Sequence, residues 1–423
     1  MTKVIHGYDK YQLEYHQPAG CPGSGQAANF APMISVDEAR STLLAHVSPN
    51  VAREYSLEEA PGRILASDIV AGVDVPGFDN SAMDGYAFAF REGLTRYQVA
   101  GVVRAGDWPE DPLPAGQAMR IFTGAPIPPG ADTVLPQEAG RCLDGVLEFE
   151  PGVTSQGANV RTRSSQCPAG SRIASRGCEC TPGMIALLAS VGTTRLQLIA
   201  PPKAAVVATG NELCAPGLSL KPGQVYNSNG PAVSAYLRRA GISEIEQHLA
   251  PDSPESLHAM LDDCLKRCDC LVITGGISVG DADYVRETLQ NLGVECLFYK
   301  VRQKPGKPLF VGKLENKWVF ALPGNPAAVL SCLNLYAVPV LRGVMGFPHA
   351  FPQVPKFPLA QDWEKKSGLT HFAKAEVREG SVHILGGQAS FDLLAFQRAN
   401  CFVEFEENAE FFPAGTLVPC HPW

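Results

Sequence analysis

The sequence predicts a multidomain protein of the α/β plus β class. Its 423 residues are enough for about three compact domains of roughly 150 residues each. Between Pro201 and about Gly346, strand-like and helix-like runs alternate, which is typical of a doubly wound parallel sheet with helices on both faces. On either side of this segment, short β-like runs lie between turns rich in Pro and Gly, so we expect two smaller β domains there.

Two helix signals flank the first β segment. Ser35 is a suitable N-cap, because two acidic residues follow it in the first turn and apolar residues then recur at helical spacing. Thr181 is the N-cap expected for a second helix, with Pro182 at the first helical position and Gly192 at the end. The chain before Met33 shows no periodicity and is expected to be a mobile extension.

The remaining elements follow in chain order. The β-like runs of the inserted domain include Arg63 to Val70 and Val146 to Phe149. The α/β segment gives strands and helices at Ala204–Ala208, Pro231–Ala240, Cys270–Thr274, Ala282–Leu292, Trp318–Leu322 and Ala327–Leu341, and the last segment gives strands at His371–Val377, Ser381–Leu385 and Cys401–Phe405. The expected domains are therefore an extension (1–32), a helical linking domain (33–50 with 166–200), a β-rich inserted domain (51–165), an α/β domain (201–346) and a C-terminal β domain (347–423).

Composition excludes several classes of function. A net charge of −8 and a pI near 5.7 argue against a nonspecific nucleic-acid binder or a membrane-surface protein. The most apolar run, Ala327 to Leu341, is too short to span a bilayer, so no membrane span is expected. Thirteen cysteines without a leader sequence or a disulfide-like spacing indicate the reducing cytoplasm.

The cysteines do not point to a metal centre. Cys264, Cys268 and Cys270 are closely spaced, but thiols packed against the sheet are the favoured interpretation, with a metal site as the alternative. Neither HExxH nor a paired CxxC is present, which argues against a catalytic transition metal held by protein ligands.

Polar loops follow three of the predicted parallel strands. They are Ala208–Leu213, Thr274–Asp283 and Leu322–Pro326, and they should open onto one edge of the sheet, where ligands bind in open α/β folds. The backbone N–H groups between Gly275 and Gly280 suit a phosphate or another oxyanion. The alternative is a tight strand-to-helix turn in which Asp281 or Asp283 only caps the helix.

Two further features suit an anionic ligand. The Lys304-Pro305-Gly306-Lys307-Pro308 segment sets two ammonium groups on a chain stiffened by prolines, although a solvated turn with surface lysines would have the same sequence. Asn325 is a possible cap ahead of Pro326, which would present free backbone donors; a plain capped helix is the alternative.

Two polar loops lie in the β-rich segment. They are Pro76–Tyr86 and Arg120–Pro126, the second leading on to Gln137 and Glu138, and they are suited to a hydrated divalent cation or a polar ligand. Asx and Ser/Thr turns would use the same residues. Together the loops indicate a protein that binds an anionic, phosphorylated ligand with a divalent metal, rather than a dinucleotide fold that uses them only as architecture.

In this order and spacing, seven motifs closely resemble the MoeA family of molybdopterin molybdenumtransferases. They are FDNSAMDGY (78–86), TGA (123–125), ATGNEL (208–213), NSN (227–229), GGISVG (275–280), KPGKP (304–308) and LPGNP (322–326). The resemblance covers about Met33 to Trp423. It implies an elongated four-domain subunit, a homodimer, and an active site in a cleft where two subunits meet.

The resemblance also implies an activity and a set of site residues. The family accepts adenylylated molybdopterin, inserts molybdate as a substrate at the dithiolene and releases AMP with the help of Mg²⁺. Carried over by motif, the residues expected to bind the phosphate are Gly275, Gly276 and Ser278, and those expected to orient the pterin or the metal-bound phosphates, as metal ligands, are Asp252 and Asp283. Lys300, Lys304 and Lys307 are expected to offset negative charge. The residues expected around the cleft are Asp84, Thr123 and Glu212, and those expected to contact the substrate or approach the oxyanion are Pro323, Pro326 and Ser390.

The chain departs from the family pattern at three positions. It has Asn211 where the family often has Asp, Ala389 where it has Gly, and Phe391 where it has His or a similar polar residue. The 32-residue extension is too short for an adenylyltransferase domain, so a separate adenylyltransferase protein is the expected partner. The alternatives are a noncatalytic pterin- or peptide-binding scaffold, and a molybdopterin adenylyltransferase that uses the α/β domain alone.

Overall fold

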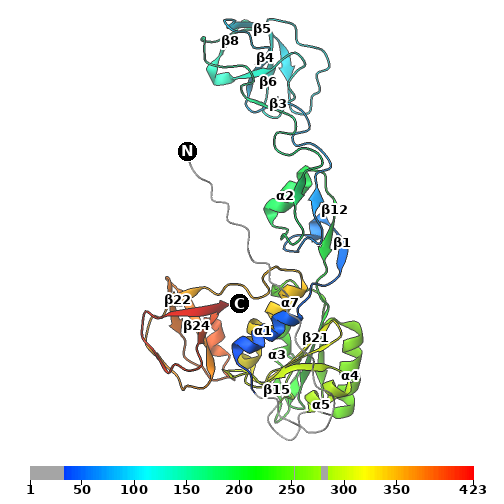
Figure 1. Cartoon of the computed structure of the whole chain (residues 1–423), viewed down its shortest axis with the longest axis vertical. Coiled ribbons are helices and arrows are strands. Elements are labelled where there is room, and N and C mark those ends of the chain that lie inside the picture. The colour runs from blue at the N-terminus through cyan, green and yellow to red at the C-terminus, as the bar shows by residue number, and fades with distance from the viewer. Residues whose placement is uncertain (1–32, 252, 278–283) are drawn as a thin grey trace. The chain divides into compact units, whose positions relative to one another are not determined.

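The structure is a computed structural model that describes residues 33–251, 253–277 and 284–423 (Figure 1). The expected extension (1–32) and three of the expected site residues, Asp252, Ser278 and Asp283, lie outside the described residues.

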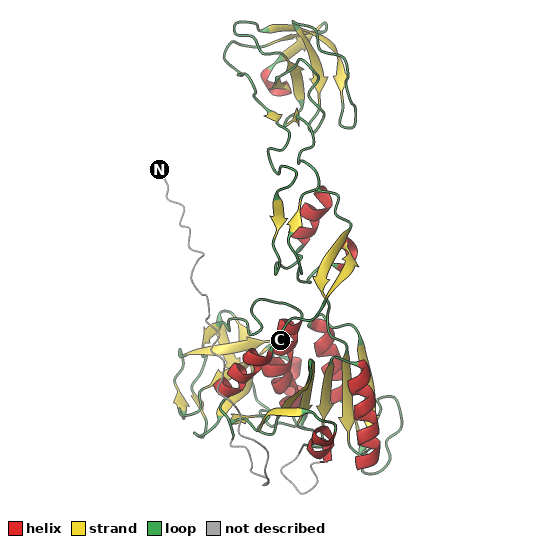
Figure 2. Ribbon diagram, turned by 45° about the vertical axis from the view of Figure 1, so that its right-hand side comes forward, coloured by secondary structure: helices red, strands yellow, loops and turns green. Residues whose placement is uncertain are grey.

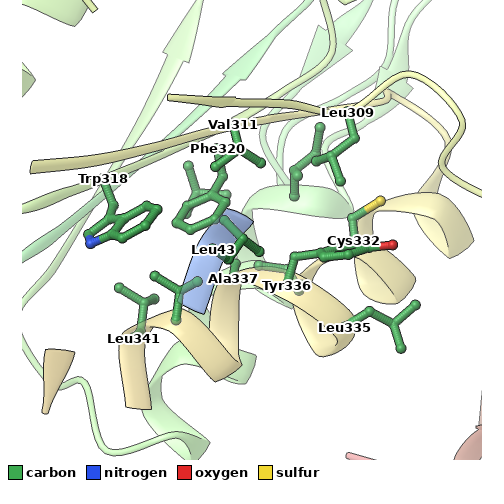
Figure 3. Close-up of a cluster of buried hydrophobic side chains, with 14 of the residues drawn as sticks. Leu43, Leu309, Val311, Trp318, Phe320, Cys332, Leu335, Tyr336, Ala337 and Leu341 are labelled. Carbon is green, nitrogen blue, oxygen red and sulfur yellow. The ribbon is translucent and has the colours of Figure 1, made fainter. Parts of the chain in front are cut away.

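The first helix is present where its cap predicts it. Helix α1 spans Val36–His46, and Ser35 forms a capping box: its Oγ accepts from Glu38 N at 3.1 Å, and its N–H donates to Glu38 Oε2 at 2.6 Å. However, α1 does not pack with residues 166–200 as expected. Its buried stripe joins the core of the α/β domain, because Leu43 fits among apolar side chains such as Leu341 and Trp318 there (Figure 3).

The linking region is built from paired strands and one helix. Strand β1 (Ala52–Ser56) pairs antiparallel with β12 (Arg195–Ile199), and β2 (Ile69–Val70) with β11 (Arg172–Ala174). Helix α2 (Pro182–Ser190) is capped by Thr181 and stops before Gly192 (φ +76°), as predicted. The expected start of the inserted domain at residue 51 is therefore too early, since β1 and β2 bury their apolar side chains against β11, β12 and α2. The short turn η1 (Leu57–Glu59) follows β1.

The inserted segment forms the β domain that the sequence predicts. Its six-stranded sheet has the order β7-β4-β6-β5-β9-β8. The bounds are β4 (Gly85–Phe88), β5 (Arg96–Val103), β6 (Gln117–Ile121), β7 (Thr133–Pro136), β8 (Arg141–Leu143) and β9 (Val146–Glu148); β3 (Asn80–Ser81) pairs with β10 (Val160–Arg161), and η2 (Gln137–Ala139) is a single turn. The rings of Phe88, Tyr97 and Phe149 stack in one of its two small cores.

The α/β domain contains the three predicted parallel strands, a fourth parallel strand (β16) that the sequence analysis did not predict, and two antiparallel strands. The order is β16-β13-β17-β21-β20-β18, and the first four strands are parallel. The strands are β13 (Ala204–Thr209), β16 (Ile245–Ala250), β17 (Cys270–Thr274), β18 (Glu295–Tyr299), β20 (Phe310–Leu314) and β21 (Lys317–Leu322); β14 (Leu213–Cys214) and β15 (Val225–Tyr226) form a small pair. The antiparallel pairings of β18 with β20 and of β20 with β21 need no crossover helix, which is why the alternation rule missed these strands.

Helices cover both faces of this sheet (Figure 2). They are α3 (Asn229–Arg239), α4 (Pro254–Arg267), α5 (Tyr284–Asn291), α6 (Pro326–Cys332), the π-helical turn η3 (Leu333–Ala337) and α7 (Val338–Val344). Alternate residues of each parallel strand enter two separate cores, for example Val272 and Ile273 of β17. Cys264 and Cys268 are buried in one core and Cys270 in the other, which agrees with thiols packed against the sheet.

The apolar run in this domain is longer than the sequence predicts. Helical structure is continuous over the 19 residues Pro326–Val344, which is long and apolar enough to span a membrane by length and composition alone. Most of the run is buried inside the protein, where η3 and α7 pack against the sheet.

The C-terminal segment forms a β domain around the predicted strands. Its sheet has the order β19-β24-β26-β28-β22, and β25 pairs antiparallel with the C-terminal end of β24. The bounds are β19 (Gln303–Lys304), β22 (Lys356–Pro358), β24 (Thr370–Arg378), β25 (Ser381–Ile384), β26 (Cys401–Phe405) and β28 (Leu417–Pro422); β23 (Trp363–Glu364) pairs with β27 (Phe411–Phe412), and η4 (Leu394–Gln397) is a short turn. Strand β19 comes from the α/β segment, so this pairing joins the two domains.

Candidate functional site

The predicted polar loops meet at one edge of the sheet. The parallel register sets Ala208 beside Thr274 and Thr274 beside Leu322, so the three strands end together. The N–H of Gly275 donates to the carbonyl of Leu322 at 3.1 Å. The loops after β13, β17 and β21 therefore face the same space, which is where open α/β folds bind ligands.

Only glycine fits the first two positions after β17. Gly275 and Gly276 have φ values of +91° and +68°, in the left-handed region. A Cβ on Gly275 would lie 2.6 Å from the Thr209 carbonyl oxygen, and one on Gly276 would lie 2.4 Å from Val285 Cγ2. Glycine at both positions therefore lets the loop backbone pack closely against Thr209 and Val285.

Two hydroxyl groups beside this loop lack partners. The side chains of Thr209 and Thr274 are buried at the ends of β13 and β17, and neither Oγ1 has a hydrogen-bond partner within the described residues. A buried hydroxyl without a partner costs free energy, and Thr209 Oγ1 lies 3.0 Å from where a Cβ on Gly275 or Gly276 would be, directly beneath the glycine loop. Thr209 lies in the ATGNEL motif and Thr274 begins the Thr274–Asp283 loop, but nothing in the pattern distinguishes them as unpartnered.

Glu212 brings a carboxylate to the same edge. Gly210, at φ +153°, leaves room for it: a Cβ there would lie 2.6 Å from Glu212 Oε2. Among residues 33–251, 253–277 and 284–423, no group of three or more His, Cys, Asp or Glu side chains is arranged to hold a metal ion. Mg²⁺ bound through substrate phosphates needs only one or two protein carboxylates, so Glu212 fits such an ion.

The lysine loop is docked onto the C-terminal β domain. Lys304 of β19 pairs in parallel register with His371 of β24, and the side chains of Lys304 and Lys307 are exposed. Burial, together with the nearby charges of Lys304 and Lys365, lowers the pKa of His371 to about 4. His371 is therefore neutral at pH 7, and the positive charge here belongs to the lysines.

Lys300 lies between β18 and β19, shortly before the lysine loop. Its backbone is in the left-handed region (φ +78°), its N–H donates to Leu309 O at 3.2 Å, and its carbonyl accepts from Ile34 N at 3.3 Å. Its Nζ lies 5.1 Å from the ring centre of Tyr299.

The loop after β21 brings Ser390 to the edge. Pro326 is the first residue of α6, but Asn325 does not cap the helix with its side chain as expected. Instead its Nδ2 donates to Ser390 Oγ at 3.1 Å, and Ala327 N donates to Ser390 O at 3.0 Å. Pro323 and Gly324 precede this contact, and Gly324 O accepts from Asn229 Nδ2 at 2.8 Å. A residue of the C-terminal domain is thus fixed beside the α/β loops.

Lys374 supports the Ser390 loop and is absent from the expected site residues. Its side chain is 2% exposed, and its Nζ donates to the carbonyls of Ala389 and Asp392 at 3.1 and 2.8 Å. Burial lowers its pKa. The only available signal was a lysine inside the predicted strand His371–Val377, and an exposed strand face would explain such a lysine equally well. Phe391, next to Ser390, is 73% exposed.

Asp84 and Thr123 form a second group, in the β domain. The N–H and the Oγ1 of Thr123 both donate to Asp84 Oδ1, each at 2.8 Å. These two bonds, the backbone one first, lower the pKa of Asp84. Arg120 donates to Gly85 O at 3.1 Å and lies over the ring of Tyr86. Within the described residues, no hydrogen bond or ion pair joins this pair to the lysine loop.

Family models match almost all of the described chain. The MoeA N-terminal region (domain I and II) matches residues 34–192, a probable molybdopterin binding domain matches residues 205–343, and the MoeA C-terminal region (domain IV) matches residues 356–423.

Curated relatives match over nearly their whole length. The chain is 33% identical over 403 residues to the molybdopterin molybdenumtransferase of Haemophilus influenzae, covering 92% of this chain and 99% of that protein. It is 32% identical over 401 residues to the protein of the same name from Staphylococcus epidermidis, covering 91% and 94%.

Solved structures agree with this match. One of the molybdopterin biosynthesis MoeA protein from Pyrococcus horikoshii has a TM-score of 0.76 and 30% identity, over 92% of this chain and 99% of that one. A second structure of the protein from that organism has a TM-score of 0.77 at 24% identity, over 93% and 100%.

Proposed function

Since the chain belongs to the MoeA family, we propose that it inserts molybdate into adenylylated molybdopterin and releases AMP. That the chain is a transferase of molybdenum cofactor biosynthesis follows from the family. The adenylylated form of the substrate and the release of AMP are the finer part of the proposal. One observation supports it: the loops after β13, β17 and β21 end together at one edge of the sheet, where Asn325 binds Ser390, and the lysine loop packs against α6, the helix that follows this edge.

The glycine loop binds the pterin-side phosphate. In this proposal the backbone N–H groups after β17 bind the phosphate, with Ser278 as a further phosphate-binding residue. Binding there holds the dithiolene end of the substrate toward the lysine loop and the Ser390 loop.

The lysines stabilise the charges that meet during the reaction. The phosphoanhydride and molybdate are both anions, so bringing them together needs positive charge fixed in advance. Lys304 and Lys307 extend from a loop anchored on β24, and Lys300 flanks it. Water attacks the phosphoanhydride and gives up a proton, the P–O bond to AMP breaks, and these ammonium groups stabilise the negative charge on the departing phosphate.

Mg²⁺ is the proposed cofactor. When bound, it neutralises phosphate oxygens and favours departure of AMP. Glu212 would hold it from the β13 side, and Asp252 and Asp283 are the proposed further ligands. Ser390, with Pro323 and Pro326, borders the opening through which molybdate enters, and Asn325 holds the Ser390 hydroxyl in place.

A homodimer completes the proposed site. In it, a second copy of the chain supplies the Asp84 and Thr123 pair to the cleft, where the low pKa of Asp84 keeps a carboxylate charged and held at a fixed position. A separate adenylyltransferase supplies the substrate, and the proposed compartment is the cytoplasm.

AMP release tests this function. The purified protein is given adenylylated molybdopterin and Mg²⁺, with and without molybdate, beside the variants Lys304→Gln and Asp283→Asn. The expected result is AMP release that requires molybdate and fails in both variants. Lys356→Gln, which changes an exposed lysine of β22, is the matched control and should keep full activity.

Two outcomes would contradict the proposal. AMP release that is equally fast without molybdate would indicate a hydrolase. Tight binding of the pterin without any AMP release, in a titration by calorimetry, would indicate a scaffold.

A further inference from the structure

Gln303 is a fully buried polar residue directly before the lysine loop. Its side chain is 0% exposed, next to the apolar core that contains Cys332 and Tyr336. A buried amide is costly unless its donors and its acceptor are all used. The partners of this amide therefore indicate what holds it there.

All the partners of the Gln303 side chain belong to the lysine loop or to the helical run beneath it. Its Nε2 donates to the carbonyls of Pro305 and Gly306 at 3.1 and 3.2 Å. Its Oε1 accepts a hydrogen bond from the hydroxyl of Tyr336. The amide thus connects the backbone between Lys304 and Lys307 to a buried tyrosine.

Tyr336 comes from the π-helical turn η3 and is also 0% exposed. Its hydroxyl end lies on the side of Cys332, while the rest of the cluster is apolar (Figure 3). Cys332 lies directly under the loop: a Cβ on Gly306, whose φ is +84°, would come within 2.4 Å of its Sγ. The loop backbone thus packs against the end of α6, and the Gln303 side-chain amide binds it there by hydrogen bonds.

We propose that Gln303 and Tyr336 are positioning residues that fix the Lys304–Pro308 loop so that Lys304 and Lys307 face the reacting anions. This inference rests on the proposed function of the lysines. The lysine side chains are exposed, so the placement of their charge depends on the loop backbone. The two carbonyls that Gln303 binds lie between the two lysines in the chain.

A direct test measures the loop without using activity. Cys332 is covered by Gly306, and Cys270 is buried in the same domain away from the loop. The rate at which a small maleimide labels each thiol is followed by mass spectrometry in the wild type, Gln303→Met, Tyr336→Phe and the double variant. Loop release should speed labelling of Cys332 by about tenfold or more relative to Cys270, because only the first opens with the loop.

The double variant separates positioning from stability. Each single change leaves a buried polar group without its partner and should lower the melting temperature. Changing both removes the unpaired Tyr336 hydroxyl that Gln303→Met leaves, so the double variant should be more stable than Gln303→Met alone. In the double variant the Pro305 carbonyl loses the Gln303 amide and the Gly306 carbonyl keeps only the weak contact of the Cys332 thiol at 3.9 Å, so we expect Cys332 labelling to remain fast. We also expect its kcat/KM for molybdate-dependent AMP release to remain about 10- to 100-fold low, since small misplacements of catalytic groups cost that much.

Tyr236→Phe is the matched control, because the buried Tyr236 hydroxyl lacks a partner within the described residues. It should change neither labelling nor activity. Wild-type labelling ratios in the double variant would overturn the proposal. Fast Cys332 labelling with unchanged molybdate kinetics would show that the loop is held as described but that its lysines do not act in the reaction, which is a failure of the proposed function instead.

Discussion

The ion cluster that joins α1 to the C-terminal β domain gives a stability prediction whose sign and size follow from the structure. Glu404 Oε2 lies 2.9 Å from Arg40 Nη2 and 2.6 Å from His421 Nε2, and its side chain is 19% exposed. Burial alone would raise the pKa of Glu404, but the hydrogen bonds with His421 and Arg40 outweigh it and hold the pKa at about 2, against an ordinary 4.5.

Because folding lowers the pKa of Glu404, the free energy of unfolding depends on pH. A carboxylate whose pKa is lowered on folding stabilises the folded state above its unfolded pKa and loses this contribution as the pH falls through the folded value. At 1.36 kcal/mol per pKa unit, the contribution is about 3 kcal/mol at pH 7, and it falls to about 1 kcal/mol at pH 3.

Glu404→Gln removes the charge and keeps the shape. At pH 7 it should lower the free energy of unfolding by about 3 kcal/mol, which for a C-terminal domain of under about 100 residues lowers the melting temperature by about 12 to 24 °C. Calorimetric scans of wild type and variant at pH 7, 5 and 3 measure the difference, which should shrink below about pH 4.5.

Glu376→Gln is the matched control on the same sheet. Glu376 pairs with Arg398 at 2.7 Å, but the Arg398 side chain is 58% exposed, so its loss should cost under about 1 kcal/mol. A difference between wild type and Glu404→Gln that stays the same from pH 7 to pH 3 would refute the assignment of the stability to the Glu404 charge.

Three further predictions concern the site and the core. Lys304→Gln should lower kcat for AMP release by about 10²- to 10³-fold with the fold intact by circular dichroism, the scale of losing one fixed donor; a loss under about fivefold would argue against a role in the transition state. Gly276→Ala places a Cβ 2.4 Å from Val285 Cγ2 at a positive φ, so calorimetric titration should show weaker pterin binding, whereas Gly72→Ala, with open space around it, should not. Leu43→Ala should destabilise by about 2 to 5 kcal/mol in urea unfolding, because Leu43 is fully buried, while Leu44→Ala, at a side chain 51% exposed, should stay within about 0.5 kcal/mol; equal effects would contradict the packing of α1.

Local signals in the sequence located the elements that local chemistry determines. Ser35 and Thr181 cap the helices that they predict, and Cys270–Thr274 is a strand with the predicted bounds. The three loops at the sheet edge follow from the rule for parallel strands, since strand direction places their ends together whatever the rest of the chain does.

The partners of these elements were harder to predict, because they depend on contacts between distant segments. The apolar stripe of α1 is visible in the sequence, but its spacing does not say which apolar surface covers it. The two-residue strand β19 has no periodicity at all, and it exists only because Lys304 lies beside His371. Asn325 had a plausible local role as a cap and instead binds Ser390, which is 65 residues away in the chain.

These long-range contacts have one consequence for how the site is built. Lys304 is attached to the C-terminal domain through the β19–β24 pairing, and the loop after β21 is attached to it through Ser390. The described start of the glycine loop, in contrast, is attached to the α/β sheet, through the bond from Gly275 to Leu322. A change that loosens the C-terminal domain should therefore displace the groups assigned to molybdate and to the leaving phosphate while sparing the groups assigned to the pterin-side phosphate. The groups proposed to bind the substrate and the groups proposed to act in metal transfer therefore depend on two different sets of tertiary contacts, although both lie at one edge of the sheet.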